Sequence, residues 1–121
     1  MAKILIVDDS LISRKKLRQI LESAGHEIAG EACDGDEAFK KYEELQPDLV
    51  TMDITMPNVD GITVLKMIME AHPDAKVVMI TALGKGGKIL EALNAGAKNY
   101  ITKPYEDEQI VNSIKEALEQ L

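Results

Sequence analysis

The chain has 121 residues, 45% hydrophobic and 29% charged, so we expect one folded domain over residues 1–121 and exclude a disordered chain. Its 14 basic and 21 acidic side chains give a net charge of −7. This charge argues against nucleic acid or an anionic membrane as a partner, because Lys and Arg dominate such contact faces. The single cysteine excludes an internal disulfide. With no signal peptide and no apolar run near ~18 residues, we expect a cytoplasmic chain without membrane insertion.

Five apolar segments predict strands. Three of them, Ile4–Val7, Leu49–Met52 and Val77–Ile80, are nearly continuous apolar runs. Such runs are typical of strands that are covered on both faces, as in a parallel sheet. The segments Ile28–Ala32 and Tyr100–Ile101 are weaker and predict two further strands.

Apolar residues with helical spacing occupy the intervals between these strands and the end of the chain. The five stripes lie within Leu17–Ala24, Ala38–Leu45, Ile62–Met69, Ile89–Leu93 and Ile110–Leu121. Asp34 and Asp60 precede the second and third stripes and are typical helix N-caps. Gly25 and Gly96 follow the first and fourth stripes, where glycine commonly ends a helix.

Strands and helices therefore alternate five times, which predicts an α/β fold of three layers with one parallel sheet between two layers of helices. Five units are too few for a closed (β/α)8 barrel. We expect an open, doubly wound (βα)5 sheet with the flavodoxin-like strand order 2-1-3-4-5. In such sheets, ligands bind outside the carboxyl ends of the strands.

Polar residues follow four of the predicted strands: Asp8 and Asp9 the first, Asp53 the third, Thr81 the fourth and Lys103 the fifth. Each alone has a simpler explanation as a turn residue, a helix cap or a solvated lysine. Together they would meet at one edge of the sheet. Three crowded carboxylates repel one another unless a cation joins them, and few hard oxygen ligands suit Mg2+. A lysine and a hydroxyl facing that cation suit a phosphoryl group.

The motifs that carry these residues occur in a specific order. They are Ile4 to Ser10, Asp53 to Pro57 with Asp60-Gly61, Thr81-Ala82 and Lys103-Pro104. The ordered set resembles the receiver domain of two-component response regulators over Lys3 to Leu121. Because nothing is left over for an output domain, the chain is most similar to the stand-alone chemotaxis type of this family, the CheY type.

The resemblance implies a role for each residue at the sheet edge. Asp53 would be the phosphoacceptor that takes a phosphoryl group from the phosphohistidine of a sensor histidine kinase. Mg2+ would be bound by Asp9 directly and by Asp8 through water, and Asp53 and the backbone carbonyl of Thr55 would be further ligands. Lys103 would pair with the phosphoryl oxygens.

The same resemblance implies a switch and an output. Thr81 would hydrogen-bond to the phosphoryl group, and Tyr100, the family's switch aromatic, would then rotate inward. A target protein would bind the face formed by the fourth helix, the fifth strand and the fifth helix. The peptide between Lys103 and Pro104 is where the family has a cis bond. Such a protein is a monomeric phosphoacceptor switch that assists its own phosphorylation and dephosphorylation, rather than an enzyme in the usual sense.

Three alternatives stay open. The chain could be a phosphorelay carrier that passes its phosphate to a histidine phosphotransfer protein. A haloacid-dehalogenase-type phosphatase also has an aspartate nucleophile after a strand, but it needs a second Asp two residues later, where this chain has Thr55. A flavodoxin needs a Ser- and Thr-rich phosphate loop after the first strand, where Asp8 and Asp9 would repel phosphate.

Two other features are easily over-interpreted. The run Gly84-Lys85-Gly86-Gly87 lacks the GxxxxGK[ST] spacing of a phosphate-binding loop, so we expect a flexible loop. Cys33 follows an apolar segment, and we expect it to be a small apolar strand residue.

Overall fold

The computed structural model describes residues 1–82 and 86–120 and contains a five-stranded parallel sheet. The elements in chain order are β1 (Lys3–Val7), α1 (Leu11–Ser23), β2 (Glu27–Ala32), α2 (Gly35–Leu45), β3 (Leu49–Met52), α3 (Gly61–Ala71), β4 (Val77–Ala82), α4 (Gly86–Asn94), β5 (Asn99–Lys103) and α5 (Asp107–Glu119). The strand order is β2-β1-β3-β4-β5, as predicted.

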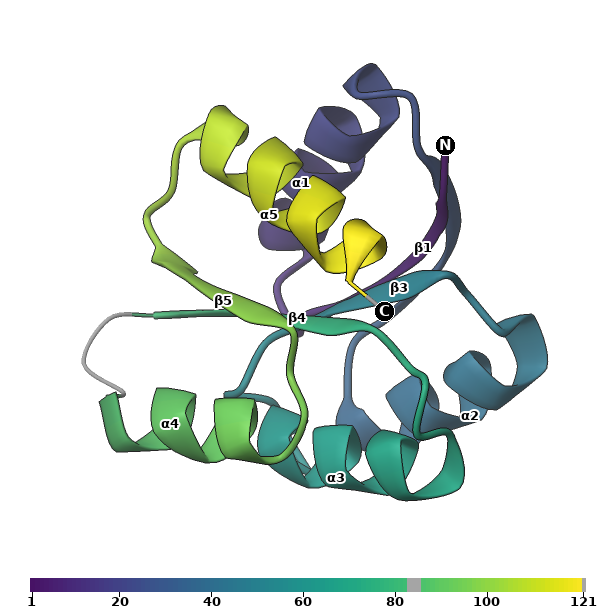
Figure 1. Ribbon diagram of the computed structural model, residues 1–121, viewed down its shortest axis with the longest axis vertical. Helices are drawn as coiled ribbons and strands as arrows, with labels where there is room; N and C mark the ends of the chain where they lie inside the picture. Colours follow the sequence, from purple (N-terminus) through teal and green to yellow (C-terminus); the bar gives the residue numbers. More distant parts are fainter. Residues whose placement is uncertain (83–85, 121) are drawn as a thin grey trace.

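Helices cover both faces of the sheet (Figure 1). Helices α1 and α5 lie on one face, and α2, α3 and α4 lie on the other. Each face has its own hydrophobic core, because successive side chains of a strand point to opposite faces. Ile4 and Ile6 of β1 belong to the core under α1 and α5, while Leu5 and Val7 belong to the core under α2, α3 and α4. The apolar runs of the sequence therefore correspond to strands that are covered by helices on both faces of the sheet.

The predicted helix ends are confirmed. The side chain of Asp34 accepts a hydrogen bond from the backbone N–H of Glu37, and that of Asp60 accepts one from Thr63, so both are N-caps. Gly25 follows α1 with φ of +90°, in the left-handed region that L side chains avoid. Helix ends at these positions follow from local chemistry.

Three details differ from the sequence-based expectations. Strand β4 continues to Ala82, so Thr81 lies inside the strand, opposite Thr102 of β5. Gly86 and Gly87 begin α4 rather than belonging to a loop, while Gly84 and Lys85 of the predicted flexible loop lie outside the described residues. Leu121, the last residue of the fifth stripe, lies outside them as well.

Cys33 is the third difference: it is exposed and follows β2 instead of lying within it. Its backbone N–H donates to the carboxylate of Glu37, at the turn that begins α2. The strand ends at Ala32, as in the predicted segment, and Cys33 belongs to this turn. In the described part of the chain, no helix is long and apolar enough to cross a membrane.

Candidate functional site

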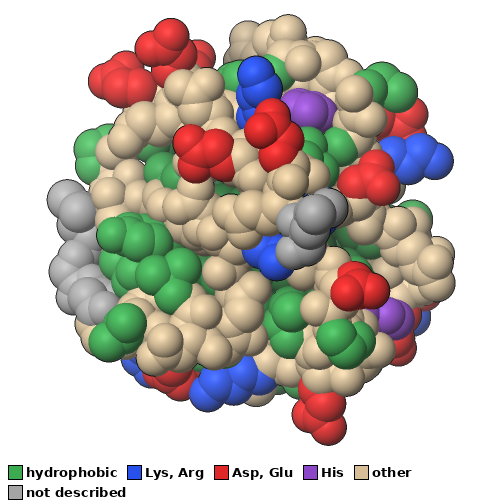
Figure 2. All heavy atoms as spheres, in the orientation of Figure 1, with side chains coloured by type: hydrophobic (Ala, Val, Ile, Leu, Met, Phe, Trp, Pro, Cys, Tyr) green, Lys and Arg blue, Asp and Glu red, His purple; other side chains and the backbone are tan. Residues whose placement is uncertain are grey.

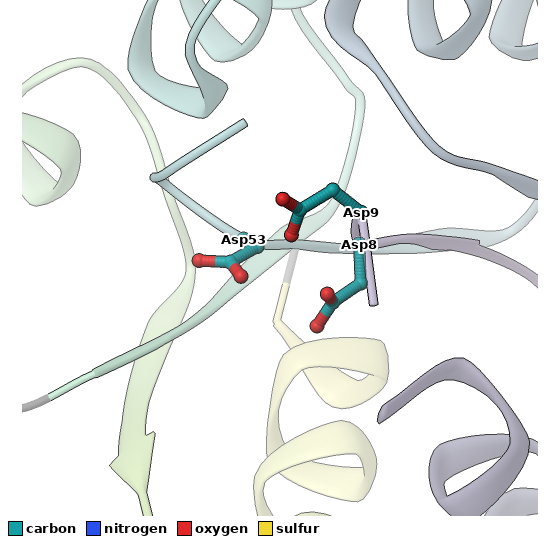
Figure 3. A group of neighbouring side chains, drawn as sticks. All are labelled: Asp8, Asp9 and Asp53. Carbon is teal, nitrogen blue, oxygen red and sulfur yellow. The ribbon is translucent and has the colours of Figure 1, made fainter. Parts of the chain in front are cut away.

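Three aspartates meet at the carboxyl edge of the sheet (Figure 3). Asp8 and Asp9 follow β1, and Asp53 follows β3, the strand that pairs with β1. One carboxylate oxygen from each of the three lies within 4.8 Å of the other two. Asp8 and Asp53 are buried, whereas Asp9 is exposed. The cluster is thus open to solvent on the side of Asp9 and closed on the side of Asp8.

Lys103 enters this cluster from the end of β5. Its ammonium Nζ donates a hydrogen bond of 2.8 Å to Oδ2 of Asp8 and one of 3.3 Å to Oδ2 of Asp53. Burial alone would lower the pKa of Lys103, but the hydrogen bond to Asp8 and the charges of Asp53 and Asp8 outweigh it and raise that pKa. The lysine therefore carries a full positive charge between two carboxylates. The following peptide, Lys103-Pro104, is cis, as expected.

The environment of Asp53 disfavours its charged form. Burial raises its pKa above the usual range, and the nearby charge of Asp8 adds to this effect, while Lys103 and the backbone N–H of Thr55 counteract it. The N–H of Thr55 donates to Oδ1 of Asp53 over 3.2 Å. The two oxygens are thus held from opposite sides, by a backbone amide and by an ammonium group.

The loop after Asp53 is packed against the start of α3 with little room to spare. A Cβ atom added to Gly61 would lie 1.9 Å from the carbonyl oxygen of Asp53. The N–H of Gly61 donates to the carbonyl of Ile54 over 2.8 Å. Glycine is required here because the two backbone segments approach so closely. The Asp60-Gly61 pair of the sequence motif therefore both begins α3 and fixes the position of Asp53.

Thr81 lies fully buried near the end of β4, and its hydroxyl oxygen Oγ1 has no hydrogen-bond partner among the described residues. A buried hydroxyl without a partner costs free energy, so it is informative when it occurs beside a polar site. It is available to donate to a group that arrives at the carboxyl edge. This fits the role expected for Thr81.

The remaining predicted site residues occupy less enclosed positions. Thr55 is exposed, in the loop that follows Asp53. Tyr100 lies in β5 opposite Met79 of β4, and 41% of its surface is exposed. In this structure the Tyr100 ring is therefore not packed in the core.

The sequence analysis did not identify Arg14 or Glu31 as part of this region. Arg14 of α1 donates a hydrogen bond of 2.8 Å to the backbone carbonyl of Asp8 and one of 2.9 Å to the carboxylate of Glu31 in β2. A signal was present: Glu31 is a charged residue that follows the small residues Ala29 and Gly30 inside a predicted strand, and Arg14 and Arg18 are one helical turn apart.

The donor set fits a hard divalent cation. Carboxylates clustered within 4.8 Å supply the oxygen ligands that Mg2+ prefers, and the exposed side of Asp9 leaves room for water. The hydroxyl of Thr81, which no described residue binds, and the ammonium of Lys103 fit a phosphoryl group beside the cation.

Residues 4–115 match the family model described as the response regulator receiver domain. The chain belongs to the response regulator receiver domain family. A chemotaxis protein CheY of Thermotoga maritima is 46% identical over 112 residues, which cover 93% of each chain. Protein CcdB of Bacillus subtilis is 45% identical over 118 residues, 98% of each chain. Among solved structures, the CheX–CheY–BeF3–Mg2+ complex of Borrelia burgdorferi has a chain that is 42% identical, with a TM-score of 0.93 and coverage of 98% of this chain and 90% of that one.

This receiver domain is CheY-like and is a chemotaxis response regulator that signals through a phosphoacceptor aspartate. Receiver domains of this kind bind Mg2+ at their aspartate cluster. The CheY relatives of this chain are phosphoacceptor switches rather than enzymes of the usual kind. The receiver-domain interpretation of the sequence is thus confirmed, and it is favoured over the phosphorelay carrier, the phosphatase and the flavodoxin.

Proposed function

We propose that Asp53 of this receiver domain is the phosphoacceptor, and that residues 1–121 act as one unit. The observation that carries the proposal is the position of Asp53: a buried carboxylate 3.3 Å from the ammonium of Lys103 and clustered with two other aspartates. Asp8 already pairs with Lys103 more closely, at 2.8 Å, and its other oxygen accepts a hydrogen bond from the N–H of Ser10. The two hydrogen bonds of the Asp53 carboxylate, 3.2 Å from the N–H of Thr55 and 3.3 Å from Lys103, are both longer than those of Asp8.

The reaction is a transfer between two residues. An oxygen of Asp53 attacks the phosphorus of a kinase phosphohistidine, the P–O bond forms, and the P–N bond breaks. The imidazole nitrogen keeps the bonding pair and takes up a proton from solvent. Lys103 moves its hydrogen bond from the carboxylate to a phosphoryl oxygen, and its raised pKa keeps it charged for that role.

Asp9, Asp53 and the backbone carbonyl of Thr55 would hold Mg2+ directly, with Asp8 acting through water. When bound, the ion supplies positive charge that offsets repulsion between the incoming phosphate and the carboxylates. These residues together allow the domain to assist its own phosphorylation and dephosphorylation. The burial of Asp8 and the exposure of Asp9 support this division of roles.

The output is proposed at the face formed by α4, β5 and α5. Large hydrophobic residues are exposed on two of these elements, namely Leu90 and Leu93 on α4 and Tyr100 on β5. In Figure 2, hydrophobic side chains gather in the region of α4 and β5. The Thr81 hydroxyl would turn toward the phosphoryl group, and Tyr100 would move into the space that it leaves.

The partners in this proposal are a sensor histidine kinase and a target protein that binds the phosphorylated form. A cytoplasmic monomer that does not bind nucleic acid is part of the same proposal. Its net charge of −7 supports a protein partner over nucleic acid.

The acceptor is tested with acetyl phosphate and MgCl2, followed by the intact mass of the protein. Wild type should gain one phosphoryl group, and Asp53→Asn should gain none, because an amide cannot form the acyl phosphate. The control is Asp36→Asn, at an exposed acid in the first turn of α2. It should behave as wild type. Phosphorylation of Asp53→Asn to the wild-type level would refute the assignment.

A further inference from the structure

Arg14, in the first turn of α1, links the acidic cluster to β2. Its Nη1 donates to the backbone carbonyl of Asp8 over 2.8 Å, and its Nε donates to Oε1 of Glu31 over 2.9 Å. The guanidinium is rigid and planar, so fixing one edge on a carboxylate determines where the other edge points. The Arg14 side chain is only 14% exposed, which limits screening of these contacts by solvent.

Glu31, which holds Arg14, is itself held by two further residues. Its Oε2 accepts a hydrogen bond of 2.8 Å from Nε of Arg18 on α1. Its backbone carbonyl accepts one from the ammonium of Lys41 on α2. Partial burial would raise the pKa of Glu31, but the hydrogen bonds and charges of Arg18 and Arg14 hold it below the usual range. The anchor for Arg14 is therefore ionised and fixed in place.

With other described residues, Asp8 makes four hydrogen bonds, and the one from Arg14 is to its backbone carbonyl. The N–H of Asp8 donates to the carbonyl of Ala32, while its carboxylate accepts from the N–H of Ser10 and from Lys103. The carbonyl belongs to the peptide that joins Asp8 to Asp9. Because a peptide is planar, the direction of this carbonyl determines the orientation of the Asp9 N–H and constrains where the Asp9 side chain begins.

We propose that Arg14 is a positioning residue for the cation site: held by Glu31, it fixes the peptide between Asp8 and Asp9 and thereby aims their carboxylates. The inference rests on the proposed function, because the aim of these carboxylates matters only if they bind a cation. Loss of a group that orients metal ligands typically lowers metal affinity by roughly 10- to 100-fold.

A simpler explanation is that Arg14 only ties α1 to β2. Arg18 separates the two explanations, because it lies one helical turn later and binds the same Glu31 carboxylate. Its other ion pair is with Glu22, within α1. Replacing Arg18 removes a comparable link between α1 and β2 while leaving the hydrogen bond to the Asp8 carbonyl in place.

The experiment compares Arg14→Met and Arg18→Met with wild type in 15N NMR titrations with MgCl2 alone. Arg14→Met should raise the Mg2+ dissociation constant about tenfold. In the metal-free protein it should also move the amide signals of Asp9, whose N–H shares the peptide with the bound carbonyl. Arg18→Met should leave the dissociation constant and the Asp9 signals close to wild type, even if it lowers the melting temperature as much.

Equal dissociation constants in the two variants would overturn the inference. If Arg14→Met does not fold, Arg14→Lys takes its place, because lysine keeps the charge but cannot bridge Glu31 and the carbonyl with two edges. A folded Arg14→Lys with wild-type Mg2+ affinity would likewise overturn it. In either case, a wild type that still binds Mg2+ and accepts phosphate leaves the proposed function standing. A wild type that does neither overturns both.

Discussion

The two ends of the sheet differ in how their polar side chains are placed: those at the amino end lie nearer the surface, and several of those at the carboxyl end are buried. At the amino end, polar side chains are paired with backbone: Asp48 accepts from the N–H of Lys3 over 2.8 Å, and Lys76 donates to the carbonyl of Leu118 over 2.7 Å. At the carboxyl end, Asp8 and Asp53 are buried close together, and the Thr81 hydroxyl has no partner in the described part of the chain.

This contrast shows where the fold gains stability and where it keeps chemistry. Paired polar groups contribute to stability, whereas like charges and unpaired hydroxyls reduce it. Both ends belong to the same strands and share the same cores, so the difference does not come from packing. The residues at the two ends of the strands produce the difference. Three tests can sharpen or contradict it.

The largest effect concerns packing at the carboxyl end. Gly61→Ala should lower the free energy of unfolding by roughly 3 kcal/mol, because the new Cβ would overlap the carbonyl oxygen of Asp53 and move the acceptor loop. Gly87→Ala is the matched control in α4, where a Cβ meets nothing within 4 Å. It should be neutral or add up to about 1 kcal/mol, since Ala favours helix over Gly. Urea denaturation measures both, and a tolerated Gly61→Ala would contradict the close approach.

The second effect concerns the crowded carboxylates. If half-saturation lies near 1 mM, 10 mM Mg2+ should stabilise the wild type by about 1.4 kcal/mol, because the native cluster binds the ion and the unfolded chain does not. Asp9→Ala should abolish most of this stabilisation by Mg2+. The control is Asp48→Ala at the amino end of the sheet. Asp48→Ala should cost about 1 kcal/mol through the lost hydrogen bond to Lys3, with the Mg2+ response intact. Thermal melts with and without MgCl2 measure these changes, and an unchanged Mg2+ response in Asp9→Ala would rule out this ligand.

The smallest effect separates two buried hydroxyls. Thr51 of β3 and Thr81 of β4 are both buried without a hydrogen-bond partner among the described residues. Replacing either by Val keeps its shape and removes an unpaired polar group, so each variant should gain about 1 kcal/mol of stability. Only Thr81→Val should weaken the shift of the Tyr100 ring NMR signals when beryllofluoride and Mg2+ are added. Equal Tyr100 shifts in both variants would break the proposed coupling between Thr81 and Tyr100.

Much of the fold follows from local features of the sequence. Strand β3 occupies the predicted Leu49–Met52, because an apolar run covered on both faces has few alternatives. Asp34, Asp60 and Gly25 mark helix ends by chemistry that acts over only a few residues. The exposure of Cys33 was mispredicted, because the end of β2 depends on the turn that begins α2, and an apolar neighbour does not reveal it.

The sequence by itself determined which residues lie at the carboxyl edge of the sheet. Asp8, Asp9 and Asp53 follow strands, Lys103 ends one and Thr81 lies one residue before the end of another, and parallel strands bring such residues to one edge. Only the tertiary structure decided how they interact. It placed Lys103 nearer to Asp8 than to Asp53 and brought Arg14 to both the Asp8 carbonyl and Glu31. It also left the Thr81 hydroxyl without a partner among residues 1–82 and 86–120. These contacts join residues on different strands and helices, and their distances depend on the register and packing of the whole sheet, which no local pattern encodes.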